Sequence, residues 1–269
     1  MIPAQFDYVA ANSAAHAIDL LGQHGDDAKV LAGGHSLLPM MKLRLAAPAV
    51  LIDIARTPGL SGISLDDGEV VVGATTRHAD VASSDLVRTE APLLAHAASL
   101  VGDPQIRHRG TIGGSLAHAD PAADLPMALL VLGGSVEISG PAGTRSVAAE
   151  DFFTGFFETA MADGELLTAV RVPRQPGVPW GYQKFVRRSN DWAIVGAAAI
   201  NGRIALANMG STPLRARAAE QALAGGASPA EAAELAAEDT TPGEDIHADR
   251  DFRRHLARVL TRRALEHLS

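Results

Sequence analysis

Two glycine pairs flanked by hydroxyl residues are the segments of this chain best suited to binding an anion. The first pair lies in Ala32-Gly33-Gly34-His35-Ser36, and the second lies in Thr111-Ile112-Gly113-Gly114-Ser115. Because glycine adopts positive φ at no steric cost and lets the backbone approach a ligand, the N–H groups around such a pair converge on an anion. Each turn is therefore expected to hold one phosphate, and a pyrophosphate between the turns would explain both.

Residues beside the second pair add positive charge to that region. Arg107, His108 and Arg109 precede it, although the chain as a whole has a net charge of −8. The alternative is that each glycine pair marks an ordinary tight turn, which an isolated pair usually does. Ser36 fits a phosphate donor or a helix cap better than a nucleophile, because no Ser-His-Asp arrangement can be assigned from sequence order.

Other kinds of site find little support in the sequence. The chain has no cysteine, which excludes disulfides, iron–sulfur ligands and a cysteine nucleophile. His108, His118 and Asp120 lie close together, but their spacing matches no zinc-ligand pattern, so hydrogen-bonding roles are favoured over a metal site. Their individual roles stay open. The sequence also has no G-x-G-x-x-G motif and no P-loop.

The composition is that of a globular protein with a core. The 269 residues are 47% hydrophobic and 20% charged, which leaves room for two domains. The negative net charge argues against nucleic-acid binding, because phosphate backbones are bound by clustered Lys and Arg. The N-terminal residues lack the features of a secretory signal, and the longest apolar run, residues 192–200, is too short to span a membrane. A cytoplasmic location is expected.

Hydrophobic spacing and turn residues predict alternating strands and helices up to residue 172. A helix is expected between Ser13, as its N-cap, and Gly25, as its stop. Strands are expected at residues 30–31, 50–54, 70–72, 136–138 and 167–172, and helical segments at 79–86, 92–101 and 122–132. Residues 102–121 are expected to form a polar loop that carries the second glycine pair.

A proline-rich linker at residues 173–179 predicts a domain boundary. After it, three antiparallel strands are expected at residues 182–186, 193–200 and 203–207. Asn201-Gly202 is a strong signal for a hairpin turn between the last two strands. The alanine-rich residues 218–237 and the apolar series within 256–268 predict a helical layer over this sheet.

The strings around both glycine pairs are long enough to be specific. They read AGGHSLLPMMK at residues 32–42 and TIGGSLAHADPAADLP at 111–126, and they are joined by GELLT at 164–168 and KFVRRSNDWA at 184–193. On these residues the chain closely resembles, over nearly its whole length, the FAD-binding medium subunit of carbon monoxide dehydrogenase and related molybdenum hydroxylases.

The resemblance implies an α+β fold in two parts. A two-subdomain FAD-binding domain of the vanillyl-alcohol-oxidase (PCMH) type is followed by a C-terminal domain of the carbon monoxide dehydrogenase flavoprotein type. That second domain has a three-stranded antiparallel sheet and a helix bundle. The corresponding limits are residues 1–176, with subdomains of about 1–56 and 57–176, and residues 177–269.

The resemblance also implies which residues bind FAD. They are residues 32–36 and 111–115 around the pyrophosphate, Asp124 at a sugar hydroxyl, and Leu167, Lys184 and Trp192 near the flavin. Without the resemblance, Asp124 is equally suited to the N-terminus of a helix, and Trp192 to packing on a sheet. Lys184 could be a solvated strand residue and Leu167 a core residue. Val101 stands where the xanthine dehydrogenase branch has an aromatic residue, so cofactor contacts on that side can differ.

The function that the resemblance implies is electron transfer within an oxidoreductase. A large partner subunit with a molybdenum–pterin centre would oxidise the substrate. A small partner subunit with [2Fe-2S] clusters would pass the electrons to FAD in this chain and on to an external acceptor. The assembly would be a dimer of heterotrimers, cytoplasmic and associated with the inner face of the membrane through its complex. Such a role needs no catalytic acid, base or nucleophile here.

Two alternatives stay open. One is a free-standing FAD-dependent oxidoreductase of the same fold, which would turn over a substrate without partners. The other is an assembly module that keeps the fold without the cofactor. The absence of cysteine disfavours the hydroxybenzoyl-CoA reductase branch, whose corresponding subunit holds an extra iron–sulfur cluster. The substrate and the electron acceptor are not predictable from this chain.

Overall fold

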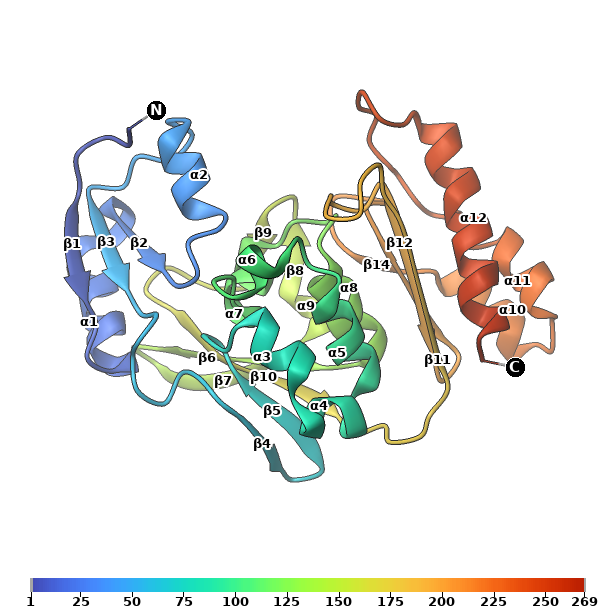
Figure 1. The fold of residues 1–269 in the computed structure, drawn as a ribbon, viewed down its shortest axis with the longest axis horizontal. Coiled ribbons are helices and arrows are strands. Elements are labelled where there is room, and N and C mark those ends of the chain that lie inside the picture. Colours follow the sequence, from blue (N-terminus) through green and yellow to red (C-terminus); the bar gives the residue numbers. More distant parts are fainter. Residues whose placement is uncertain (1, 269) are drawn as a thin grey trace.

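A computed structural model describes residues 2–268 and contains three units arranged along the longest axis of the molecule (Figure 1). A small three-stranded unit lies at one end, a five-stranded sheet covered by helices lies in the centre, and a four-stranded sheet covered by helices lies at the other end. The mixed α+β class predicted from the sequence is confirmed. The predicted domain limits at residues 1 and 269 fall outside the described residues.

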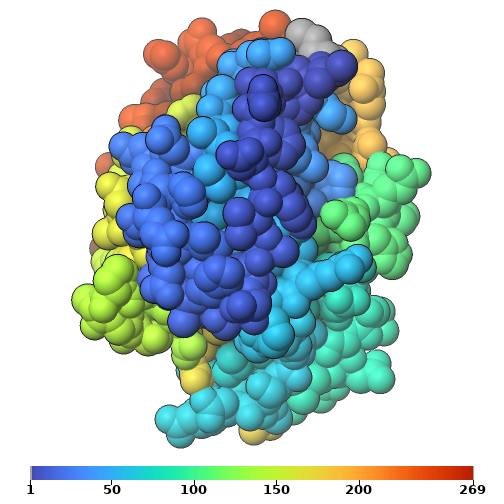
Figure 2. All heavy atoms as spheres, turned by 90° about the vertical axis from the view of Figure 1, so that its left-hand side faces the viewer, coloured from blue at the N-terminus to red at the C-terminus, as the bar shows by residue number. Residues whose placement is uncertain are grey.

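The N-terminal unit is a parallel sheet with the strand order β1-β3-β2. Its elements are β1 (Asp7–Ala10), α1 (Ala14–His24), η1 (Gly25–Asp27), β2 (Ala28–Leu31), α2 (Leu37–Lys42) and β3 (Val50–Asp53). Helix α1 begins and ends as predicted, because the Ser13 hydroxyl accepts a hydrogen bond from the N–H of His16 and Gly25 has a φ of 51°. Figure 2 views this unit face-on, in blue, with the central unit below and beside it.

The central unit is an antiparallel sheet with the order β4-β5-β10-β6-β7. Its strands are β4 (Ile63–Asp66), β5 (Glu69–Gly73), β6 (Ser135–Gly140), β7 (Gly143–Ala148) and β10 (Leu166–Pro173). Its helices are α3 (His78–Ser83), α4 (Asp85–Glu90), α5 (Pro92–Ser99), α6 (Pro104–Arg107), α7 (Ile112–His118), α8 (Asp124–Leu132) and α9 (Ala149–Phe152). A short hairpin of β8 (Phe153–Gly155) and β9 (Glu158–Thr159) completes the unit.

Two predictions for this unit, one of a helix and one of a loop, are wrong in detail. Residues 79–86 form parts of two helices, α3 and α4, because Ser84 ends the first and caps the second by accepting from the N–H of Val87 at 3.4 Å. Residues 102–121 are not one loop, since they contain helices α6 and α7. These helices begin at side-chain caps, Asp103 and Thr111, whose acceptor oxygens satisfy N–H groups of the first turn.

The C-terminal unit has one strand more than predicted. Its antiparallel sheet has the order β11-β12-β13-β14. The elements are β11 (Trp180–Phe185), β12 (Val195–Ile200), β13 (Arg203–Ala207), β14 (Leu214–Arg215), α10 (Arg217–Ala224), α11 (Pro229–Glu234) and α12 (Arg250–Glu266). Asn201 and Gly202 both have positive φ, as the predicted hairpin turn requires. The alanine-rich stretch forms two helices because Gly225-Gly226 interrupts it and Gly226 has a φ of 90°.

Helix α8 joins the central and C-terminal units. All nine of its residues are buried, and it packs against α5 on one side and against β12 and β13 on the other (Figure 1). Helices α10, α11 and α12 cover the opposite face of the C-terminal sheet (Figure 1). Within residues 2–268, no helix combines the length and the apolar character needed to cross a membrane.

Candidate functional site

The first glycine pair lies in the connection between β2 and α2, at the point where the N-terminal unit touches the central unit (Figure 1). A Cβ atom added to Gly33 would overlap the carbonyl oxygen of Arg109 and lie 2.8 Å from the Cα of Gly110. Gly34 has a φ of 77°, in the region that favours glycine. The first segment therefore contacts the backbone of the two residues that directly precede the second segment.

The connection also offers unused hydrogen-bond donors. Within residues 2–268, the N–H groups of residues 33–36 donate to no backbone or side-chain acceptor, and the hydroxyl of Ser36 does not cap α2. Three of these four residues are half-buried and His35 is exposed. A half-buried row of free N–H groups suits an anionic ligand, because each donor otherwise depends on water. We call residues 33–36 the donor loop.

The second glycine pair has a different structure from the one predicted. Gly113 and Gly114 lie in the first turn of α7, and neither has a positive φ. The N–H groups of Ile112 and Gly113 donate to the carbonyls of Thr76 and Ala74, at 3.0 and 2.8 Å. That of Gly114 donates to the Thr111 hydroxyl. The expectation of a second tight turn is wrong, because these amides are occupied by a helix and its neighbouring strand end.

Residues 74–78 hold this second segment in place, and sequence reasoning did not single them out. The backbone of residues 110–113 runs antiparallel to them, with an isolated bridge between Arg77 and Thr111. The N–H of His78 donates to the carbonyl of Gly110 at 3.0 Å. A Cβ on Gly113 would lie 2.6 Å from the Cβ of Ala74. The role of Gly113 is thus close packing on Ala74. The glycine itself is visible in the sequence, but its packing partner is not.

His78 is a buried polar residue of this region. Its Nδ1 is buried and has no hydrogen-bond partner within residues 2–268. Burial is the main reason that the pKa of His78 falls to about 4, and the nearby charges of His35 and Arg107 contribute. His78 is therefore neutral at physiological pH.

The three basic residues predicted beside the second pair lie in different environments. Nη1 of Arg107 donates to the carbonyls of Val101 and Gly102, both at 3.0 Å, and so fixes the turn before α6. His108 and Arg109 are exposed. Arg107 consequently has a structural role in addition to its charge.

Asp124 and Lys184, both predicted near the cofactor, are bonded to each other. The Lys184 Nζ lies 2.8 Å from the Asp124 Oδ2, and the Tyr182 hydroxyl donates to Oδ1 at 2.6 Å. Lys184 also donates to the carbonyl of Leu100. Burial raises the pKa of Asp124 above its ordinary value, and the contact with Lys184 opposes that shift. This buried ion pair ties the start of α8 to β11, and so connects the central unit to the C-terminal unit.

The other two residues predicted near the flavin differ in exposure. Leu167 is buried at a bulge of β10, where the pairing with β6 shifts. Trp192 is 54% exposed in the connection between β11 and β12. A groove of about 580 Å³ with a mixed lining lies at the end of that connection and includes Phe185, Ile194 and Ile246 together with Arg187 and His247. The roles of Leu167, Lys184, Trp192 and Asp124 toward FAD stay predictions.

His118 and Asp120 make ordinary structural contacts. The His118 ring packs on Phe157 with a centroid distance of 4.9 Å, and the Asp120 Oδ1 accepts from the N–H of Ala122 at 2.8 Å. Among residues 2–268, no three His, Asp or Glu side chains are grouped as a metal site would require.

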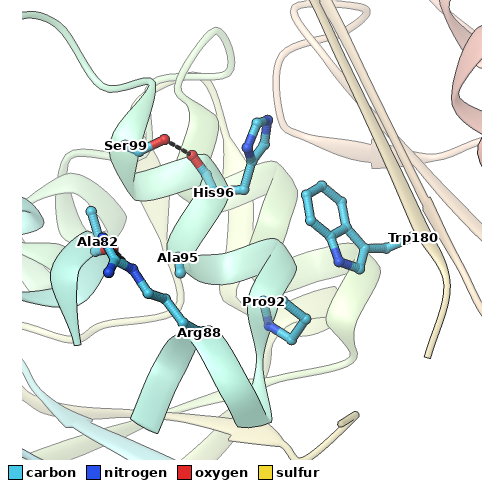
Figure 3. Close-up of a pocket in the computed structure, with 7 residues that line it drawn as sticks. All are labelled: Ala82, Arg88, Pro92, Ala95, His96, Ser99 and Trp180. Carbon is cyan, nitrogen blue, oxygen red and sulfur yellow. Dashed lines mark hydrogen bonds between the residues drawn. The ribbon is translucent and has the colours of Figure 1, made fainter. Parts of the chain in front are cut away.

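A separate recess lies between α5 and β11. It has a volume of about 250 Å³, and its lining includes Arg88, Ser99, His96 and Trp180 (Figure 3). The rings of His96 and Trp180 lie side by side with centroids 5.0 Å apart and planes tilted by 45°. None of the residues predicted to bind FAD lines this recess.

Comparison with known protein families identifies the chain. Residues 4–175 match the FAD-binding domain in molybdopterin dehydrogenase. The chain belongs to this family. Residues 180–268 match the C-terminal domain of the carbon monoxide dehydrogenase flavoprotein. The predicted family, an FAD-containing oxidoreductase subunit of the molybdenum-hydroxylase type, is confirmed.

Individual relatives agree with this assignment. The chain is 43% identical to the carbon monoxide dehydrogenase medium chain of Hydrogenophaga pseudoflava, over 98% of this chain and 97% of that one. It is 39% identical to subunit alpha of the 6-hydroxypseudooxynicotine dehydrogenase complex of Paenarthrobacter nicotinovorans, over 98% and 95%. A solved carbon monoxide dehydrogenase from Hydrogenophaga pseudoflava, which lacks the Mo-pyranopterin moiety, superposes with a TM-score of 0.96 at 45% identity and covers 100% of this chain and 98% of that one.

The residues of the donor loop fit the FAD that the family binds. A pyrophosphate is bound best by several N–H donors and by hydroxyls, and residues 33–36 present four unused N–H groups and the free hydroxyl of Ser36. The second segment presents the side chain of Ser115, while its backbone amides are already bonded. The two segments therefore differ in what they can donate.

Proposed function

We propose that this chain is the FAD-binding electron-transfer subunit of a heteromeric, carbon monoxide dehydrogenase-like molybdenum hydroxylase. A large subunit with a molybdenum–pterin centre oxidises the substrate, and a small subunit with [2Fe-2S] clusters delivers electrons to this chain. The observation that carries the proposal is the donor loop, whose N–H groups are free and whose Gly33 packs against the backbone of residues 109–110. The matches along both halves of the chain support it.

Bound FAD supplies the chemistry of accepting electrons and passing them to an external acceptor. The chain's own residues bind and orient it. The donor loop offers hydrogen bonds to the pyrophosphate, and Ser115 offers a half-buried hydroxyl from the other segment, where the buried Thr111 hydroxyl caps α7. The buried pair of Asp124 and Lys184 places charge and hydrogen-bonding groups at the seam between α8 and β11.

No residue of the chain has to transfer a proton or form a covalent bond in this role. The assignments of Asp124 to a sugar hydroxyl and of Leu167, Lys184 and Trp192 to the flavin belong to the proposal. So do the limits of the FAD-binding domain at residues 1–176 and of the C-terminal domain at residues 177–269. The dimer of heterotrimers and the association of the complex with the inner face of the membrane are further parts of it.

The test is purification of the tagged chain from its own cells under native conditions. Co-purifying chains are identified, and FAD, molybdenum and iron are quantified together. We expect about one FAD per chain, together with a larger molybdenum-containing chain and a smaller iron–sulfur chain. FAD without partners or metals would favour the free-standing oxidoreductase, and a chain that cannot be loaded with FAD would overturn the proposal.

A further inference from the structure

The donor loop, Gly110 and the His78 ring form three layers in contact. A Cβ atom on Gly33 would lie 2.8 Å from the Cα of Gly110, so the donor loop rests on one side of that residue. A Cβ atom on Gly110 would lie 2.7 Å from Cδ2 and 2.8 Å from Nε2 of His78. The imidazole therefore fills the space that a side chain at residue 110 would need.

Hydrogen bonds fix Gly110 between these two neighbours. Its carbonyl accepts from the N–H of His78 at 3.0 Å, and its own N–H donates to the carbonyl of Ile106 at 2.7 Å. His78 is only 4% exposed and starts α3, which packs against α5 and α6. The ring thus belongs to the central unit, whereas Gly33, on the other side of Gly110, belongs to the N-terminal unit.

We propose that His78 is a positioning residue of the FAD site: its ring supports Gly110 and so sets the distance between the donor loop and residues 110–113. This inference rests on the proposed function, because it assigns the two segments to one cofactor. His78 touches no substrate or cofactor in this role. Its effect passes through the backbone of Gly110, which has no side chain to absorb a displacement of the ring.

The low proton affinity of His78 is consistent with that role. A pKa of about 4 keeps the ring neutral, and a neutral ring can remain buried beside the charges of Arg107 and His35. The unpartnered Nδ1 shows that the ring is not held by a hydrogen bond from that atom within the described residues. Packing, including the contact with Gly110, holds the ring in its position.

The experiment is a double-mutant cycle on the full chain stripped of FAD. The variants are Gly110→Ala, His78→Ala and the double variant, and Gly22→Ala is the matched control, since a Cβ there meets nothing within 4 Å. The Kd for FAD is measured by titration against protein fluorescence, and the Tm of each apo variant is measured in parallel. Gly110 has no positive φ, so alanine is compatible with its backbone.

We expect Gly110→Ala to raise the Kd about tenfold or more, because its methyl group meets the imidazole. His78→Ala alone raises the Kd about threefold, since it removes the support behind Gly110. The double variant returns the Kd to within about threefold of the wild type, because the new methyl group occupies space vacated by the ring. A purely structural role would lower the Tm and leave the Kd unchanged.

Two results would overturn the inference: a Gly110→Ala variant that binds FAD as the wild type does, or a double variant that binds as weakly as Gly110→Ala. If Gly110→Ala cannot be recovered folded, the double variant decides, because the inference requires it to fold and bind FAD. Failure of the wild-type chain to bind FAD at all would contradict the proposed function instead, so the two failures are distinguishable.

Discussion

At Gly33 the missing side chain makes room for the backbone of a distant segment, whereas at Gly113 it makes room for Ala74 within the same unit. The donor loop around Gly33 keeps its N–H groups unbonded, while the amides of residues 112–115 all donate within the protein. The same Gly-Gly pattern therefore builds a set of unbonded donors in one place and a fully bonded helix start in the other. For a bound pyrophosphate, the first segment supplies hydrogen bonds and the second supplies a fixed surface.

The largest effect expected from this difference is on how the free energy of unfolding depends on pH. The reason is His78, which is buried behind the second segment, whereas His35 in the donor loop is exposed. His78 has a pKa of about 4 in the folded protein and about 6.5 when unfolded, so the unfolded state binds the extra proton first as pH falls. Its stabilising contribution is complete above pH 6.5 and is lost as the pH approaches 4. The loss amounts to about 3 kcal/mol at most.

The measurement is the free energy of unfolding in urea between pH 7.5 and 4, for the wild type and for His78→Leu. Burial also lowers the pKa of His96 and His118, so only the difference between the two proteins reports on His78. We expect the wild type to lose more stability than the variant over this range. Equal slopes would mean that His78 is not protected from protonation in the folded protein.

The next effect concerns the donor loop itself. We expect Gly33→Ala to weaken FAD binding about 10- to 100-fold, because the added methyl group overlaps the carbonyl of Arg109 and pushes the loop away from residues 109–110. The apo protein should keep its Tm within a few degrees, since each unit retains its own core. Titration of FAD against the variant and against Gly22→Ala gives the comparison. Wild-type affinity in Gly33→Ala would show that the contact does not shape the loop.

The sequence predicts the local features of this molecule better than the contacts between distant segments. Ser13 and Gly25 delimit α1, and Asn201-Gly202 forms the predicted turn between β12 and β13. Both predictions succeed because a cap or a turn depends on a few neighbouring residues. Strand β14 has only two residues and pairs with β13, so it has no periodic pattern to detect.

The candidate site shows the same division. The two glycine pairs stand out in the sequence, yet nothing in it states that Gly33 packs on Gly110 or that Thr76 and Ala74 accept hydrogen bonds from α7. The bond between Asp124 and Lys184 joins residues 60 positions apart, and either residue taken alone also fits a helix cap or a solvated strand position. Contacts of this kind depend on the tertiary fold, which composition and spacing do not specify.

The smallest effects separate the two glycines of the second segment. We expect Gly113→Ala to lower the free energy of unfolding by about 1 to 2 kcal/mol, because its Cβ would lie 2.6 to 2.8 Å from Cβ, carbonyl oxygen and Cα of Ala74. Gly114→Ala should stay within about 0.5 kcal/mol of the wild type. Its Cβ meets only the Thr111 hydroxyl, and alanine favours the helix by an amount that offsets a weakened cap.

Urea unfolding of both variants, with FAD titration of the folded proteins, distinguishes packing from donation. If residues 112–115 act as a fixed surface, Gly113→Ala loses stability while its folded fraction binds FAD with a Kd near that of the wild type. A large loss of affinity in Gly114→Ala at unchanged stability would show the opposite. The N–H of Gly114 would then have to leave the Thr111 hydroxyl and donate to the cofactor, and the contrast with the donor loop would no longer hold.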